Sequence, residues 1–150
     1  MIKNCHNIII VNIILFLVLS FSFHVQAQFV ETVVFSHPKI VDGLYVDPTG
    51  NVYTSSGGLV GGVQIGKYDI NLNSYNPNFA LGFSGPINIA SYRDSLLIVT
   101  NFDNGTVSSL NLNNNSLRII ASGLHGPAGI VVDTFENIYI TNWGTYQGLA

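Results

Sequence analysis

The chain is short of charge and almost free of cysteine. Asp, Glu, Lys and Arg make up 9% of its 150 residues, and acidic residues outnumber basic ones by eight to five. No basic patch for nucleic acid is present. The one cysteine, Cys5, lies near the N-terminus, so the rest of the chain has no disulfide, thiolate metal site or cysteine nucleophile. Its stability must come from packing.

Amphipathic helical stripes are also missing after residue 28, whereas Asn, Ser, Thr and Gly are abundant. This balance favours many short strands joined by tight turns.

Residues 1–27 are predicted to be a secretory signal peptide. Lys3 supplies the positive charge, Ile8 to Phe23 form the apolar run, and Val25-Gln26-Ala27 predicts cleavage after Ala27. The alternative is an uncleaved membrane anchor, but the run is shorter than the roughly 20 residues that span a bilayer. Cys5 precedes the apolar run and is not placed as a lipoprotein cysteine. We expect a secreted, periplasmic or cell-surface protein with no membrane attachment after cleavage.

The chain after the signal is repetitive. Ala80 to Pro86 matches Ala121 to Pro127 at an interval of 41 residues, and Leu97 to Asn101 matches Ile138 to Asn142 at the same interval. Fixed periods of this size indicate a repeat architecture.

An earlier copy begins 86 residues before the last one, because Gly43 to Thr54 matches Gly129 to Ile140. The first interval is therefore 45 residues. The extra residues fit the glycine-rich stretch Gly57 to Gly62, where a longer connection is tolerated.

Each unit is predicted to contain four strands, A to D, exemplified by A at Gly129 to Asp133, B at Asn137 to Thr141, C at Thr106 to Leu112 and D at Ser116 to Ala121. Turn residues separate them: Pro48-Thr49-Gly50, Arg93-Asp94-Ser95, Asn104-Gly105, Asn113-Asn114-Asn115 and Thr134-Phe135-Glu136. The apolar run Leu96 to Val99 requires cover on both faces of its sheet. Four strands in about 40 residues, repeated, predict an all-β fold of four-stranded antiparallel β-propeller blades.

Two strings carry a family resemblance: Gly126-Pro127-Ala128-Gly129-Ile130-Val131-Val132-Asp133 and Asn137-Ile138-Tyr139-Ile140-Thr141-Asn142. They resemble the NHL repeat and the senescence-marker/gluconolactonase propellers, over roughly Gly43 to Gly144. The resemblance implies a six-bladed ring. It indicates the fold far better than the activity.

The phase of the repeat predicts the layout of residues 28–150. Val33-Val34 align with Ile119-Ile120, so Phe29 to Phe35 is expected to be a lone D strand, followed by two full blades and the A and B strands of a third. Such a set cannot close a ring. We expect a fragment or incomplete gene model that needs further C-terminal blades; the alternative is a short protein that completes its ring by oligomerising.

The D to A and B to C loops of a propeller share one end, here called the loop face, and binding commonly occurs there. The candidate residues of the loop face are Ser84 and His125 from D to A loops, and Ser55, Ser56, Asn101, Phe102, Asp103, Asn142, Trp143 and Tyr146 from B to C loops.

Several of these residues have a structural alternative. His125 is either a base or ligand-binding group, or a loop residue that bonds backbone carbonyls. Asn101 and Asn142 share one register, which favours Asx-type turns bonding the backbone over ligand binding. Trp143 with Tyr146 either forms an aromatic platform or packs between blades.

Acidic residues raise the question of a metal. Asp47 and Asp133 end A strands and are predicted to brace the A to B turn. The gluconolactonase resemblance implies a divalent, calcium-type cation in the channel. Asp42 can stand in for the first acid of such a site, but Ile87 and Ala128 occupy the later ligand positions and are apolar.

Two functions follow. The first is a binding module, without evident cofactor, that holds a protein, peptide or glycan on the loop face. The second is a metal-dependent gluconolactonase-like hydrolase or a related propeller lyase, for which only Asp42, Asn88 and His125 are at hand.

Overall fold

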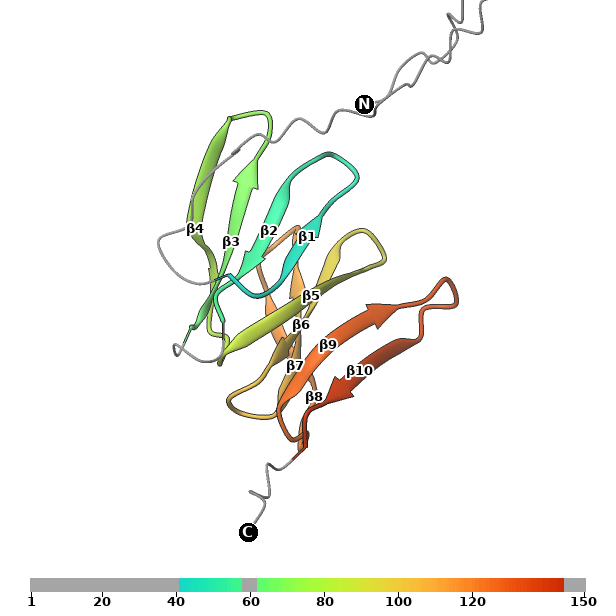
Figure 1. Ribbon diagram of the computed structural model, residues 1–150. Helices are drawn as coiled ribbons and strands as arrows, with labels where there is room; N and C mark the ends of the chain where they lie inside the picture. Colours follow the sequence, from blue (N-terminus) through green and yellow to red (C-terminus); the bar gives the residue numbers. More distant parts are fainter. Residues whose placement is uncertain (1–40, 58–61, 145–150) are drawn as a thin grey trace, which may run out of the picture. The chain divides into compact units, whose positions relative to one another are not determined.

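A computed structural model describes residues 41–57 and 62–144, and every element in this part is a β-strand (Figure 1). No membrane-crossing helix occurs among these residues. The signal peptide, the lone D strand at Phe29 to Phe35, and Tyr146 lie outside the described residues.

The strands form two four-stranded antiparallel sheets and one strand pair (Figure 1). The first blade is β1 (Leu44–Val46), β2 (Val52–Ser55), β3 (Gln64–Asp69) and β4 (Ser74–Leu81). The second is β5 (Pro86–Tyr92), β6 (Leu96–Asn101), β7 (Thr106–Asn111) and β8 (Leu117–Ala121). The third supplies β9 (Pro127–Val132) and β10 (Ile138–Asn142).

This arrangement confirms the all-β, blade-type prediction and the order of strands within each unit. The bounds differ slightly. The third A strand begins at Pro127 rather than Gly129, and the following B strand is displaced by one residue, to Ile138–Asn142. The backbone pairing of Asn142 with Pro127 extends the ladder toward the loops.

The core lies between the first and second blades. Tyr53 and Ile65 of the first blade pack with Leu97, Val99 and Leu110 of the second, and all five are buried. Ile98 points to the opposite face of β6 and is also buried. Cover on both faces of this apolar run is therefore confirmed for Leu97 to Val99.

A hydroxyl group on each complete B strand links its blade to the next one. The Ser55 Oγ accepts a hydrogen bond from the Gly43 N–H at 2.9 Å and donates to the Ile87 carbonyl at 2.7 Å. Gly43 directly precedes β1 of the first blade, whereas Ile87 belongs to the second blade. One hydroxyl therefore satisfies two backbone groups and connects the two blades.

The second blade repeats this bond one unit later. The Thr100 Oγ1 accepts from the Asn88 N–H at 3.1 Å and donates to the Ala128 carbonyl of the third blade at 2.8 Å. In the third blade, Thr141 Oγ1 accepts from the Gly129 N–H at 2.7 Å. The hydrogen bonds of the blade contact therefore recur at equivalent positions of the sequence repeat.

The A to B turns also meet at the exposed edge of the second and third blades. Arg93 and Asp94 have positive φ angles of 52° and 53°, which non-glycine residues adopt at a cost. The Arg93 Nε donates to Glu136 Oε2 at 2.9 Å, and the Tyr92 hydroxyl donates to the same oxygen at 3.1 Å. This exposed ion pair ties the two turns but contributes little stability.

We predict that Thr100→Val lowers the free energy of unfolding by about 1 to 3 kcal/mol, because the part-buried Ala128 carbonyl and Asn88 N–H lose the hydroxyl that bonds them. Urea denaturation followed by circular dichroism measures the change. The matched control is Thr141→Val, which removes the same hydroxyl from an exposed site where it bridges no second blade among the described residues. Equal losses in the two variants would contradict the bridging role.

Candidate functional site

The two kinds of loop lie side by side at one end of the blades. In the second blade, the Phe102 N–H donates to the Gly85 carbonyl at 2.9 Å and the Asp103 N–H donates to the Ser84 carbonyl at 3.3 Å. The third blade repeats these bonds from Trp143 to Gly126, at 3.0 Å, and from Gly144 to His125, at 2.9 Å. Each D to A loop therefore forms one backbone-bonded unit with the B to C loop of its own blade.

Neighbouring blades are joined at this end as well. The Leu124 N–H donates to the Gly105 carbonyl at 3.0 Å, which connects the D to A loop before the third blade with the B to C loop of the second. Gly105 has a φ of 65°, and a Cβ there would lie 2.1 Å from the Leu124 carbonyl oxygen. The predicted Asn104-Gly105 turn thus needs glycine for both its backbone angle and this close approach.

Asn101 and Asn142 hold the loops in place. The Asn101 Oδ1 accepts from the Ser84 N–H at 3.3 Å, and the Asn142 Oδ1 accepts from the His125 N–H at 2.8 Å. The predicted bonding to backbone is therefore present, although it reaches 17 residues back along the chain instead of closing a local Asx turn.

The amide nitrogen of Asn101 is also used. It donates to Thr106 Oγ1 at 3.1 Å and to Ser108 Oγ at 2.8 Å, and the residue is only 1% exposed. Asn101 belongs to the frame of the loop face, whereas Asn142 is exposed and belongs to its surface.

Ser55 and Ser56 do not reach the surface that their loop position suggested. Both are buried, and their hydroxyls bond the backbone: Ser55 bridges the blades, and Ser56 Oγ donates to the Gln64 carbonyl at 3.2 Å. Small hydroxyl residues at the end of a B strand satisfy backbone groups where two sheets converge. The expectation that these two serines contribute to the loop face is therefore corrected.

An aromatic pair on the loop face consists of the half-buried Phe102 and the exposed Trp143. Their ring centroids lie 5.7 Å apart at an interplanar angle of 78°, an edge-to-face arrangement, and Trp143 is 70% exposed. Gly126, with a φ of 63°, lies beneath: a Cβ there would be 2.8 Å from the Phe102 ring. The predicted pair of Trp143 with Tyr146 is not tested, because Tyr146 lies outside the described residues; the 41-residue repeat places Phe102 and Trp143 at one register.

His125 and Asp103 complete the exposed part of the loop face. Their side chains accept or donate no hydrogen bond among the described residues, and Asp103 lies against Gly85, whose added Cβ would be 2.5 Å from the carboxylate. A general base needs a partner that fixes its orientation and proton. No side chain among the described residues fixes the orientation of the His125 imidazole in this way.

A divalent cation does not fit the residues that the structure describes. Asp42 is exposed, and no group of three acidic, histidine or cysteine side chains within the described ranges is placed to hold a metal ion. At the later ligand positions, the Ile87 and Ala128 carbonyls accept the hydroxyl bonds that join the blades. These positions serve the blade contact.

Asp47 braces the first A to B turn, as predicted. Its Oδ1 accepts from the Thr49 and Asn51 N–H groups at 2.9 Å each, and its Oδ2 accepts from Asn51 Nδ2 at 2.9 Å and the Tyr53 hydroxyl at 3.3 Å. Burial by itself raises the pKa of Asp47, but the hydrogen bonds from Thr49 and Asn51 outweigh it and hold the pKa below its usual value. Burial, followed by the Asp47 charge, raises the pKa of Tyr53 to about 12.

Asp133 forms the same turn in the third blade. It accepts from the Phe135 and Asn137 N–H groups at 2.8 Å each, from Asn137 Nδ2 at 2.9 Å and from the Tyr139 hydroxyl at 3.0 Å. The hydrogen bond from the Asn137 side chain is the main cause that lowers the pKa of Asp133. Both carboxylates are structural and lie at the A to B turns, not in the D to A and B to C loops.

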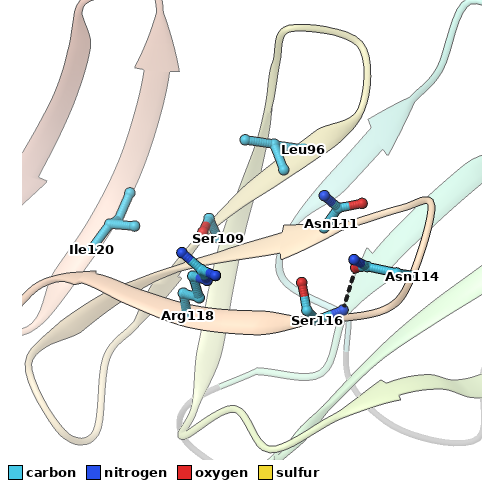
Figure 2. A pocket seen from close by; sticks show the side chains of 7 residues that line it. All are labelled: Leu96, Ser109, Asn111, Asn114, Ser116, Arg118 and Ile120. Atoms are coloured by element: carbon cyan, nitrogen blue, oxygen red, sulfur yellow. Dashed lines mark hydrogen bonds between the residues drawn. The ribbon is translucent and has the colours of Figure 1, made fainter.

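A hollow of about 460 Å³ lies over β6, β7 and β8 of the second blade (Figure 2). Its lining includes Leu96, Ser109, Asn111, Ser116, Arg118 and Ile120. Leu97 and Leu110, which alternate with lining residues along their strands, pack against the first blade, so the hollow is on the opposite face. The corresponding face of the first blade packs against the second. The hollow therefore has the position of a blade-stacking face.

The fold and loops define a protein of the β-propeller class. A solved nidogen/laminin complex contains a similar chain, with 20% identity and a TM-score of 0.58; the match covers 70% of this chain and 40% of that one. The extracellular domain of the hybrid two-component system BT3049 from B. thetaiotaomicron is similar at 18% identity and a TM-score of 0.56, covering 68% of this chain and 14% of that one.

These likenesses concern the fold alone, and the chain spans less than half the length of either matched chain. No protein-family model and no curated protein sequence matches this chain.

We predict that Asp47→Asn lowers the free energy of unfolding at pH 7 by about 1 kcal/mol, because the amide cannot accept all the bonds of the carboxylate. Since the pKa of Asp47 is depressed on folding, its contribution is present above the unfolded pKa of about 3.9 and is lost as pH falls through the folded pKa.

Thermal melts at pH 7 and pH 3 measure this difference, which should narrow at the lower pH. Asp94→Asn is the matched control, because the Asp94 carboxylate accepts no hydrogen bond among the described residues. If the melting temperatures of wild type and Asp47→Asn differ by the same amount at both pH values, the turn-bracing role of the Asp47 carboxylate is contradicted.

Proposed function

We propose that this chain is an extracellular interaction module that binds a protein, peptide or glycan on its loop face. The observation that carries the proposal is the contact of the half-buried Phe102 with the exposed Trp143, held on loops whose backbones are bonded to each other. In its finer form, the proposal is that the chain is exported by a cleaved signal peptide and that its blades belong to an NHL-like, six-bladed propeller.

The loop face combines an apolar surface with polar groups. Trp143 offers a ring edge and face that suit a sugar or an apolar side chain, and His125, Asp103 and the Asn142 amide add donors and acceptors to the same loop face. Rigid loops make such a surface effective, because little conformational entropy is lost when a ligand binds.

The similar solved structures support this direction. One is a complex named for two proteins, nidogen and laminin, and the other is described as an extracellular domain. Both descriptions agree with an exported propeller that makes contacts with other molecules, which we propose for this chain.

A metal-dependent hydrolase or lyase is the second candidate, and it rests on the gluconolactonase resemblance. It requires oxygen ligands that converge on a cation. The candidate oxygen ligands are Asp42 and Asn88, and the Asn88 Oδ1 already accepts from the Ile89 N–H at 2.8 Å. Ile87 and Ala128 contribute only carbonyls already bonded to hydroxyls. The binding module is therefore favoured.

We predict that Trp143→Ala weakens ligand binding by about tenfold or more, since an exposed aromatic anchor at the centre of a site carries much of its affinity. A panel of oligosaccharides and peptides is screened against the full chain by quenching of Trp143, its only tryptophan. Each hit is then measured by calorimetry with the variant. Phe135→Ala, which removes an exposed aromatic from an A to B turn, is the control, and equal losses in both variants would reject the loop face as the site.

We further predict that calcium or manganese at millimolar concentration leaves the melting temperature of the protein unchanged. A cation that binds the folded state stabilises it in proportion to the logarithm of its concentration. A melting temperature that rises with metal would favour the hydrolase or lyase instead.

A further inference from the structure

Asn104 and Gly105 lie in the B to C loop of the second blade, and these two residues can react with each other. Attack of the Gly105 backbone nitrogen on the side-chain carbonyl carbon of Asn104 closes a five-membered succinimide ring. A residue other than glycine has a Cβ that shields this nitrogen. Asn104 is exposed, so water reaches its amide and ammonia can leave. The Gly105 N–H donates to no described residue, so no hydrogen bond has to break before the nitrogen reacts.

The Thr106 hydroxyl bonds the atom on which negative charge develops in this reaction. Its Oγ1 donates to Asn104 Oδ1 at 2.8 Å. Attack on an amide carbon turns the amide oxygen into an oxyanion, and a donor that is already in place there lowers the barrier. The hydrogen bond of the resting turn therefore stabilises the reacting amide as well.

Asn101 sets the direction of the Thr106 hydroxyl. The Asn101 Oδ1 accepts from the Ser84 N–H at 3.3 Å, and its Nδ2 donates to Thr106 Oγ1 at 3.1 Å. Because the Thr106 oxygen accepts this bond, its proton is left for Asn104. Asn101 is 1% exposed and Thr106 is 8% exposed, so water competes little for either group. The buried frame of the second blade thus holds one donor against the Asn104 amide.

One product of the reaction does not fit the place that Gly105 occupies. The Gly105 carbonyl accepts from the Leu124 N–H at 3.0 Å, and a Cβ on Gly105 would lie 2.1 Å from the Leu124 carbonyl oxygen. Opening of the succinimide at one of its carbonyls gives isoaspartate, which adds one carbon to the backbone directly before Gly105. The backbone must then shift, and the bond that joins the loops of the second and third blades is lost.

We propose that Asn104 is a self-modification site, which converts to aspartate and isoaspartate in the folded protein, and that the isoaspartate releases the second-blade loop from Leu124. In the first step a bond forms between the Gly105 nitrogen and Asn104 Cγ. The bond from Cγ to Nδ2 breaks, and ammonia leaves with the proton of the Gly105 nitrogen. Water then opens the ring at either carbonyl. The reaction consumes only water and releases only ammonia, so it needs no enzyme or cofactor.

The first test incubates the purified full chain at mildly alkaline pH and follows Asn104 by peptide mass spectrometry, which detects replacement of the amide by a carboxylate. A synthetic peptide of residues 102–108 is the unfolded reference. Asn104 is expected to convert in the protein at least as fast as in the peptide, because the fold holds the Thr106 hydroxyl in place. Slower conversion in the protein would overturn the proposal.

Asn114 is a control within the same molecule. It is also exposed, but it precedes Asn115, whose Cβ shields the backbone nitrogen. Asn114 should stay intact while Asn104 converts. Equal conversion of the two residues would contradict the assignment of a site at Asn104.

The role of the hydroxyl is tested with Thr106→Val, which should slow the reaction by about three- to tenfold. Thr106→Ser keeps the hydroxyl and should retain the wild-type rate. The valine substitution in the peptide is the matched control and should leave its rate unchanged, since no fold holds the hydroxyl there. Circular dichroism checks that each variant folds. A folded Thr106→Val protein that reacts faster than wild type would show that the hydrogen bond protects Asn104, and the proposed role would be wrong.

The release of the loop is measured by hydrogen exchange at the Leu124 amide. The isoaspartate form, separated by chromatography, should lose protection there. The Asn104→Asp variant, which has the new charge on a backbone of normal length, should keep it. Equal protection of Leu124 in the two forms would overturn the release.

Discussion

The hydrogen bond from a B-strand hydroxyl to the carbonyl of the next blade is the contact on which the rest of the structure depends. Ser55 reaches Ile87 and Thr100 reaches Ala128, both buried hydroxyls with two backbone partners each. Apolar packing between sheets is tolerant of sliding, because it is not directional. A buried hydroxyl that bonds a defined carbonyl is directional, so it sets the register at which one blade stacks on another.

That register also positions the loop face. The blades are joined at the loops by Leu124 bonding Gly105, and each D to A loop is bonded to its own B to C loop. Phe102 and Trp143 come from different blades, so their edge-to-face contact exists only while adjacent blades keep their stacking. The surface proposed for binding therefore depends on how the blades stack. Gly126 allows this stacking, because a Cβ there would lie 2.8 Å from the Phe102 ring.

The turns between the A and B strands are stabilised in two different ways. The first and third blades use Asp and Asn, with Asp47 and Asp133 accepting from the turn backbone. The second blade has Tyr92 at the aspartate position and turns through Arg93 and Asp94 with positive φ. Arg93 then bonds Glu136 of the neighbouring turn. The aspartate of each such turn bonds only residues of its own turn and B strand, while the second turn also bonds a neighbouring turn.

Much of the fold could be predicted from residues alone, because the 41-residue repeat, the turn residues and the doubly apolar strands are local patterns. The bracing role of Asp47 and Asp133 was predictable for the same reason, since all their partners lie within six residues. Ser55 and Ser56 were not: a loop serine and a bridging serine look alike in sequence, and only the approach of a second sheet buries them. The Phe102–Trp143 pair was missed because a contact across 41 residues requires two blades to stack.

The sequence by itself therefore determined the blades, their strand order and their turns, since these follow from short-range periodicity and backbone preference. The tertiary structure decided which polar residues face a ligand and which serve the frame. It buried Asn101, whose amide nitrogen bonds Thr106 and Ser108, although the sequence placed this residue in a surface loop. The physical reason is that burial depends on the strands that lie beside a residue, and β7, which pairs with β6, covers Asn101.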